Sequence, residues 1–265
     1  MTLADLSLAA PDGVVVRYEV HGDPSAPPVV LVHGLGGDRR MWSPQIASLP
    51  AAGYFVVVPD LRGHGASDPA PSFRLADCAR DIVGILDDLG IPRAHLVGVS
   101  MGGTVVQQLT TDVPDRVRSQ ILVDSLSGIS RPAERFNAAV AALLLRVLSR
   151  RVQALLVRRA YAGRGHCEVG EYLAERLLAS DPRSLRAARL AVNRFDVLDD
   201  LPAVRVPTLV LVGDTFGELA VGMARTTAER IPGARLQILP GGGDPSNLLV
   251  PESFDAALLA FLAKE

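Results

Sequence analysis

One glycine-rich segment constrains the fold of this chain more than any other stretch: Gly98-Val99-Ser100-Met101-Gly102-Gly103. It directly follows an apolar run, residues 94–97, which we expect to be a buried strand, and it opens a predicted helix over residues 101–112. Small residues on both sides of a serine permit a sharp turn from strand to helix that leaves the hydroxyl exposed. The sequence therefore predicts a strand–turn–helix unit that presents Ser100 to a binding partner.

Short apolar runs alternate with helical patterns along most of the 265 residues. Predicted strands span residues 13–20, 28–32, 54–58, 94–99, 119–123, 207–212 and 235–239. Predicted helices span residues 40–52, 75–90, 101–112, 221–231 and 253–262. Apolar strands separated by helices are typical of a parallel sheet covered on both faces. We therefore predict an α/β fold with a mostly parallel central sheet flanked by helices.

The segment 130–200 differs from the rest of the chain. It is rich in alanine, leucine and arginine, and its 13 arginines against 8 acidic residues give it a charge of +5, which leaves −7 for the remainder of a chain of net charge −2. We interpret it as a helical insertion, with helices near 135–159, 169–178 and 184–195, between two core segments, 1–129 and 201–265. Most arginines are expected on solvated helix faces. One or two directed inward could bind a carboxylate or a phosphopantetheine group.

Composition excludes several classes of function. A net charge of −2 gives no electrostatic reason to expect nucleic acid or an anionic membrane as a partner, and two cysteines, Cys78 and Cys167, do not form a disulfide framework. The first residues lack a signal-peptide pattern, so a cytoplasmic location is expected. We find no pattern for a metal site, a dinucleotide fingerprint or a P-loop and expect no cofactor. The expected partner is a small-molecule substrate, and the oligomeric state is left open.

Three loop motifs resemble the α/β-hydrolase family, and particularly its enol-lactone hydrolase and esterase branch. They are His33-Gly34-Leu35-Gly36, Asp60-Leu61-Arg62-Gly63-His64-Gly65-Ala66-Ser67-Asp68 and the Ser100 segment, which the resemblance makes a nucleophile elbow. The resemblance extends along essentially the whole chain and implies that residues 130–200 form a cap over the active site. It also implies that the backbone amides of Leu35 and Met101 form an oxyanion hole for a developing negative charge.

The base that such a serine requires is missing from its family position. The resemblance places a histidine in the loop after the last strand, but that loop reads Leu239-Pro240-Gly241-Gly242-Gly243-Asp244, and no histidine follows His166. We expect Asp244 to be an active-site carboxylate beside Ser100, the alternative being a loop residue that binds nearby backbone amides. An ordinary aspartate, with a pKa of about 4, is a weak base, although burial would raise that value.

The acid position has changed as well, so the triad is degenerate. Counting from the predicted strand 207–212 places Phe216 where the family has its acid. Three carboxylates that could substitute are Asp214, Glu218 and, at the end of the preceding core strand, Asp124. His166, in the cap, is a candidate displaced base, and Trp42 a candidate for lining the pocket. A solvated loop histidine and a core tryptophan are the alternatives.

These observations lead to three hypotheses of function. The first is an enzyme that performs cyclisation, elimination, C–C cleavage or rearrangement of a small apolar carbonyl compound, as in natural-product biosynthesis. Ser100 would bind the substrate, the Leu35 and Met101 amides would polarise its carbonyl, and Asp244 would handle a proton. The second is a serine hydrolase of esters, lactones or thioesters with a displaced base such as His166. The third is a ligand-binding protein without catalysis.

Overall fold

The computed structural model describes residues 2–129 and 132–265, and within them eight strands form one sheet. The strand order is β1-β2-β4-β3-β5-β6-β7-β8; β1 and β2 are antiparallel to their neighbours, and all other neighbouring strands are parallel. The strands are β1 (Thr2–Ala9), β2 (Val15–His21), β3 (Pro28–Val32), β4 (Phe55–Pro59), β5 (Ala94–Val99), β6 (Val117–Val123), β7 (Thr208–Gly213) and β8 (Arg235–Leu239). This confirms the predicted mostly parallel sheet. β1 is absent from the predicted strands because its sequence contains no valine or isoleucine.

Helices cover both faces of the sheet. On one side lie α2 (Leu75–Asp88), α3 (Met101–Asp112) and α8 (Glu218–Arg230), and on the other lie α1 (Ser43–Ala51) and α10 (Pro251–Leu262), which follows the short α9 (Ser246–Leu249). Side chains that share a register row, such as Val97, Ile121 and Leu209, all pack toward α1 and α10. Burying each of these aliphatic side chains contributes roughly 1.5–3 kcal/mol. The central strands are therefore held rigidly, and so are the loops at their ends.

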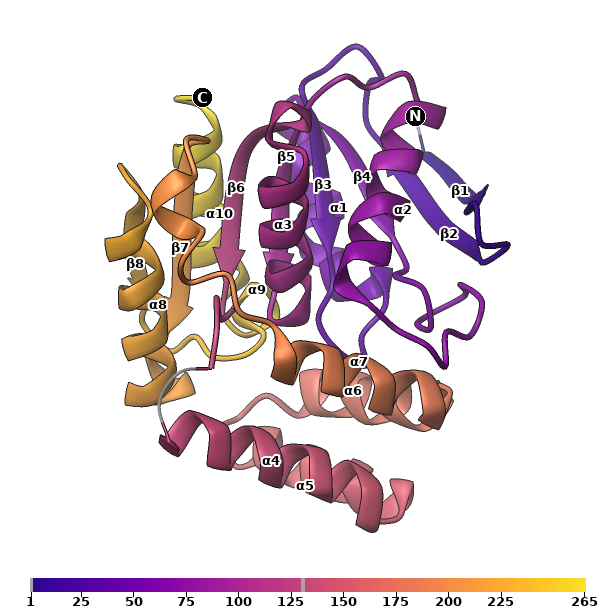
Figure 1. The fold of residues 1–265 in the computed structure, drawn as a ribbon, viewed down its shortest axis with the longest axis vertical. Helices are drawn as coiled ribbons and strands as arrows, with labels where there is room; N and C mark the ends of the chain where they lie inside the picture. The colour runs from indigo at the N-terminus through magenta and orange to yellow at the C-terminus, as the bar shows by residue number, and fades with distance from the viewer. Residues whose placement is uncertain (1, 130–131) are drawn as a thin grey trace.

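Four helices form a separate layer between β6 and β7 in the chain. They are α4 (Pro132–Val147), α5 (Arg150–Ala162), α6 (Cys167–Ala179) and α7 (Pro182–Arg194), and we call them the α4–α7 layer. In Figure 1 this layer lies across the carboxyl ends of the parallel strands, away from both chain termini. The single helix expected over 135–159 is wrong, because Ser149 has an extended backbone and its hydroxyl caps a new helix by accepting from the Val152 amide.

One buried aspartate joins this layer to the core. The Asp38 carboxylate accepts a hydrogen bond of 2.9 Å from the Tyr172 hydroxyl and forms an ion pair of 3.0 Å with Arg176, both on α6. The Asp38 carboxylate also caps the helical turn Arg39–Trp42 by accepting from the Arg40 amide. This network fixes α6 above the loop that precedes Asp38.

No helix in the described part of the chain is both long and apolar enough to cross a membrane.

Candidate active site

Ser100 occupies the turn between β5 and α3 in a backbone conformation that is unusual for a residue with a side chain. Its φ is 54° and its ψ is −116°, which stores strain of about 1–3 kcal/mol. The neighbouring glycines permit the turn, since a Cβ on Gly98 would lie 2.3 Å from the Gly102 carbonyl oxygen and one on Gly102 would lie 2.1 Å from the Val32 carbonyl oxygen. The Ser125 hydroxyl holds the turn by donating a 2.8 Å hydrogen bond to the Ser100 carbonyl.

Two backbone segments that could donate hydrogen bonds meet at Ser100. A Cβ on Gly34 would lie 3.2 Å from the Ser100 Cβ, so the loop that carries Leu35 rests directly against the serine. Met101 is the first residue of α3, and the amide of a first helical residue has no partner within its helix. The structure thus brings together the two segments predicted to form an oxyanion hole.

The Ser100 hydroxyl donates a hydrogen bond of 2.8 Å to Oδ2 of Asp244. Burial raises the pKa of Asp244 from 3.8 to about 7, the nearby Asp124 carboxylate adds to this increase, and the Ser100 hydrogen bond and the Arg189 charge oppose it. A pKa of about 7 is close to that of an ordinary histidine. Asp244 therefore combines a hydrogen bond from Ser100 with a raised pKa.

Asp124 acts on Asp244 electrostatically and forms no hydrogen bond to Ser100 in the described part of the chain. It ends β6, and its carboxylate accepts hydrogen bonds from the Gly213 amide (2.9 Å) and from both the amide (2.7 Å) and the hydroxyl (3.1 Å) of Ser246. Burial raises the pKa of Asp124, and these donors oppose that rise. Because three donors stabilise the Asp124 anion and one stabilises Asp244, we assign the last proton of the pair to Asp244.

Two side chains of the α4–α7 layer that were not predicted from the sequence reach the Asp244 segment. The Tyr161 hydroxyl on α5 donates a short hydrogen bond to the Asp244 carbonyl oxygen, and Arg189 on α7 is close enough to influence the Asp244 carboxylate electrostatically. A sequence signal for Arg189 exists, because it follows Leu185 by four residues and therefore shares the apolar face of its helix. A charged residue on a buried face indicates either a partner or a ligand.

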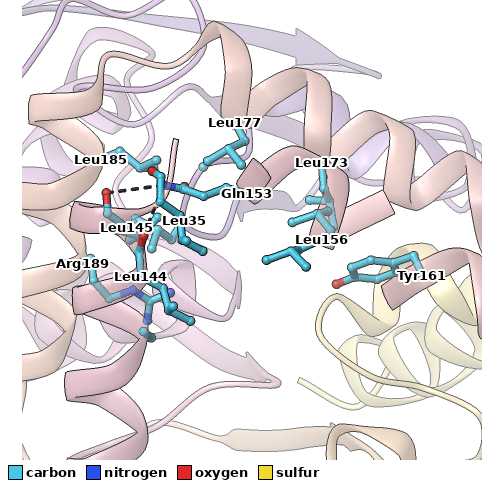
Figure 2. A pocket seen from close by; sticks show the side chains of 14 residues that line it. Leu35, Leu144, Leu145, Gln153, Leu156, Tyr161, Leu173, Leu177, Leu185 and Arg189 are labelled. Atoms are coloured by element: carbon cyan, nitrogen blue, oxygen red, sulfur yellow. Dashed lines mark hydrogen bonds between the residues drawn. The ribbon is translucent and has the colours of Figure 1, made fainter. Parts of the chain in front are cut away.

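A cavity of about 390 Å³ is lined by Leu35, Tyr161 and Arg189 from this group, whereas Ser100 and Asp244 are not among its lining residues (Figure 2). Its wall is mostly leucine, contributed by α4–α7 and by Leu35. Tyr161 and Arg189 line it as well, so the same side chains border the cavity and approach Asp244. Volumes of this size are typical of sites for small molecules.

The five histidines lie elsewhere, and in the described part of the chain none hydrogen-bonds Ser100. His33 is fully buried and bridges the Gly34 carbonyl and the Leu61 amide through its two ring nitrogens. His21, His64 and His95 also make local contacts within the core. His166 lies at the turn before α6, is partly exposed, and is not among the residues that line the cavity. The structure therefore does not bring His166 to the serine.

None of the remaining predicted site residues forms a hydrogen bond to Ser100 in the described part of the chain. Asp214 and Phe216 form an exposed turn after β7, where the Asp214 carboxylate accepts from the Gly241 amide, and Glu218 is exposed at the start of α8. Trp42 is completely buried on the α1–α10 side of the sheet and packs against Phe254. Asp214 therefore has a local structural role in its turn, and Trp42 belongs to the hydrophobic core.

Comparisons with known proteins show the family of this chain. The family model described as alpha/beta hydrolase fold matches residues 27–249, and the chain therefore belongs to the α/β-hydrolase family. The chain is 34% identical to a protein named as a carbamate hydrolase, RutD, from Variovorax paradoxus, with 94% of this chain and 96% of that protein covered. It is 28% identical to 3-oxoadipate enol-lactonase 2 of Acinetobacter baylyi, covering 97% and 96%. A thermophilic esterase from Thermogutta terrifontis superposes with a TM-score of 0.84 at 30% identity, covering 100% and 98%.

These relatives correct the first functional hypothesis. The prediction of cyclisation, elimination, C–C cleavage or rearrangement is wrong, because relatives that cover nearly the whole chain are named as hydrolases and lactonases. The changes at the histidine and acid positions suggested a departure from hydrolysis, because an aspartate with its ordinary pKa is a weak base. The broader prediction of an enzyme of the α/β-hydrolase superfamily stands.

Proposed function

We propose that this protein hydrolyses small carboxylic esters or lactones, with Ser100 as the nucleophile and Asp244 as the general base. The observation that carries this proposal is the 2.8 Å hydrogen bond from the Ser100 hydroxyl to the Asp244 carboxylate. A general base has to lie within hydrogen-bond reach of the proton it removes and works best with a pKa near the operating pH. Asp244 meets both requirements, since its pKa is about 7.

The proposed reaction has two steps. Ser100 Oγ attacks the carbonyl carbon while its proton passes to Asp244, and the bond to the leaving oxygen breaks as Asp244 returns the proton to that oxygen. A water molecule then attacks the acyl carbon and gives its proton to Asp244, which passes it to Ser100 Oγ as the acid is released. The Leu35 and Met101 amides stabilise the oxyanion in both steps, which is typically worth about 3 kcal/mol per donor.

An aspartate base also accounts for the altered acid position. A histidine base becomes a cation when it takes the proton, and a carboxylate partner stabilises that cation. Asp244 becomes neutral instead, so a carboxylate at position 216 has no cation to stabilise. Asp124 has the complementary effect, because its negative charge favours the protonated form of Asp244. The α4–α7 layer serves as the cap that leaves Asp244 only partly exposed to water.

Turnover of p-nitrophenyl esters by four proteins tests the proposal. We expect Ser100→Ala to lower kcat by at least about 10³-fold, and Asp244→Asn, which preserves shape but not basicity, to lower it by about 10²–10⁴-fold. His166→Ala is the control for a displaced base and should leave turnover unchanged. Full activity in Asp244→Asn, or its loss in His166→Ala, would overturn the assignment of the base.

A further inference from the structure

Arg189 is a charged side chain for which the described structure provides no direct partner. It lines the leucine-walled cavity, and its Nε is completely buried without a hydrogen bond. No ion pair or hydrogen bond to its guanidinium occurs among residues 2–129 and 132–265. Burial lowers the pKa of Arg189, and the Asp244 charge opposes this only from a distance. Arg189 is only partly exposed, and holding a cation partly out of water without a bonded partner is unfavourable.

Three other arginines of the same layer have partners, and of these Arg158 lies at the exposed surface. Arg176 pairs with Asp38, Arg158 pairs with Glu171 through two short hydrogen bonds, and Arg150 donates to a carbonyl at the end of α6. Unlike these three, Arg189 faces a cavity and has no bonded partner among the described residues.

The other polar groups of the cavity wall are already occupied. Gln153 donates a 2.8 Å hydrogen bond to the Leu148 carbonyl, and the Tyr161 hydroxyl donates to the Asp244 carbonyl. Figure 2 shows Arg189 on the cavity wall beside Leu144, with Tyr161 at a distance across the open space. Among the described lining residues Arg189 alone carries a charge. The cavity thus offers a ligand aliphatic surface and one free cation.

We propose that Arg189 binds a carboxylate on the substrate, so that the preferred substrates are aliphatic esters with a second, free carboxylate. The hydrocarbon chain lies against the leucines, and the planar guanidinium receives the carboxylate through paired hydrogen bonds. One guanidinium matches the single charge of a carboxylate. Positive charge also gathers on this side, because Arg146 and Arg186 border an adjoining cavity of about 290 Å³ together with Arg189. This inference rests on the proposed function, since it assigns the substrate of the same site.

Two esters of equal chain length test the inference. The p-nitrophenyl ester of heptanoic acid ends in a methyl group, whereas the mono-p-nitrophenyl ester of heptanedioic acid ends in a carboxylate. We expect the wild-type protein to favour the carboxylate ester by about 10–100-fold in kcat/KM, mainly through KM. Arg189→Met should abolish this preference and Arg189→Lys should retain part of it. Arg183→Met, an exposed arginine on the same helix, is the matched control and should keep the full preference.

A binding measurement separates this inference from the proposed function. Heptanoate should bind the Ser100→Ala protein in calorimetry, heptan-1-ol should bind at least about tenfold more weakly, and Arg189→Met should remove the difference. Heptanoate binding without ester turnover in the wild-type protein would support the carboxylate site and refute the hydrolase. Turnover with equal kcat/KM for both esters and no selective heptanoate binding would refute the carboxylate site and leave the hydrolase intact. Preference for the carboxylate ester that survives Arg189→Met would also overturn the assignment.

Discussion

Replacing Asp244 by asparagine should stabilise the protein, and by an amount that depends on pH. The pKa of Asp244 is about 7 in the folded protein and close to 3.8 in the unfolded chain. Between these values the folded state holds a proton that the unfolded state has released, so stability falls as pH rises from about 4 to about 7 and stays low above that. Asparagine has the same shape, can accept the Ser100 hydrogen bond, and does not titrate.

The size of the effect follows from the two pKa values. A difference of about three pH units, at about 1.36 kcal/mol for each unit, gives an upper bound of about 4 kcal/mol. The free energy of unfolding of Asp244→Asn should therefore match that of the wild-type protein near pH 4. It should exceed the wild-type value by about 2–4 kcal/mol at pH 8.5.

Urea unfolding at 25 °C between pH 4.5 and pH 8.5, followed by circular dichroism, measures this difference. Asp115→Asn, which removes an exposed aspartate, is the control and should show the same pH dependence as the wild-type protein. Parallel stability curves for Asp244→Asn and the wild-type protein would refute the reasoning, because they would show that the pKa of Asp244 is not raised in the folded protein.

Three further substitutions have expected outcomes. Asp124→Asn removes the like charge that helps to raise the pKa of Asp244, so the pH midpoint of kcat/KM should move down. A pH–rate profile measures this midpoint, and an unchanged midpoint would count against the electrostatic effect of Asp124. Tyr161→Phe loses the hydrogen bond to the Asp244 carbonyl and should lower the free energy of unfolding by about 1 kcal/mol in urea. Gly102→Ala places a Cβ 2.1 Å from the Val32 carbonyl oxygen and should cost about 3 kcal/mol or more, seen as a lower Tm.

The sequence was sufficient to predict the architecture because the deciding signals are local. Apolar runs such as Val29–Val32 mark buried parallel strands, and the glycines at 98 and 102 mark the close approach of α3 to the sheet. Asp244 could be placed for a similar reason, since the Gly-Gly run before it fixes the loop. The helix break at Ser149 was missed because a single capping serine within a leucine-rich segment is a weak signal.

The properties of the site could not be predicted in the same way. The raised pKa of Asp244 arises from burial and from Asp124, which is 120 positions away in the sequence. Tyr161 and Arg189 reach the site only because α5 and α7 fold over the strand ends. An aspartate with its ordinary pKa is a weak base, so the sequence favoured non-hydrolytic chemistry. The named activities of the relatives correct that prediction, and the raised pKa of Asp244 removes its chemical basis.

The rate at which a fluorophosphonate labels Ser100, measured by mass spectrometry across pH, tests the central claim most directly. The assignment of Asp244 as the base predicts that the labelling rate rises with pH, reaches half its maximum near pH 7 and then levels off. It further predicts that Asp244→Asn lowers the plateau by about 10²–10⁴-fold. Labelling of Ser100 at the same rate in Asp244→Asn, or a rate with no inflection near pH 7, would contradict it.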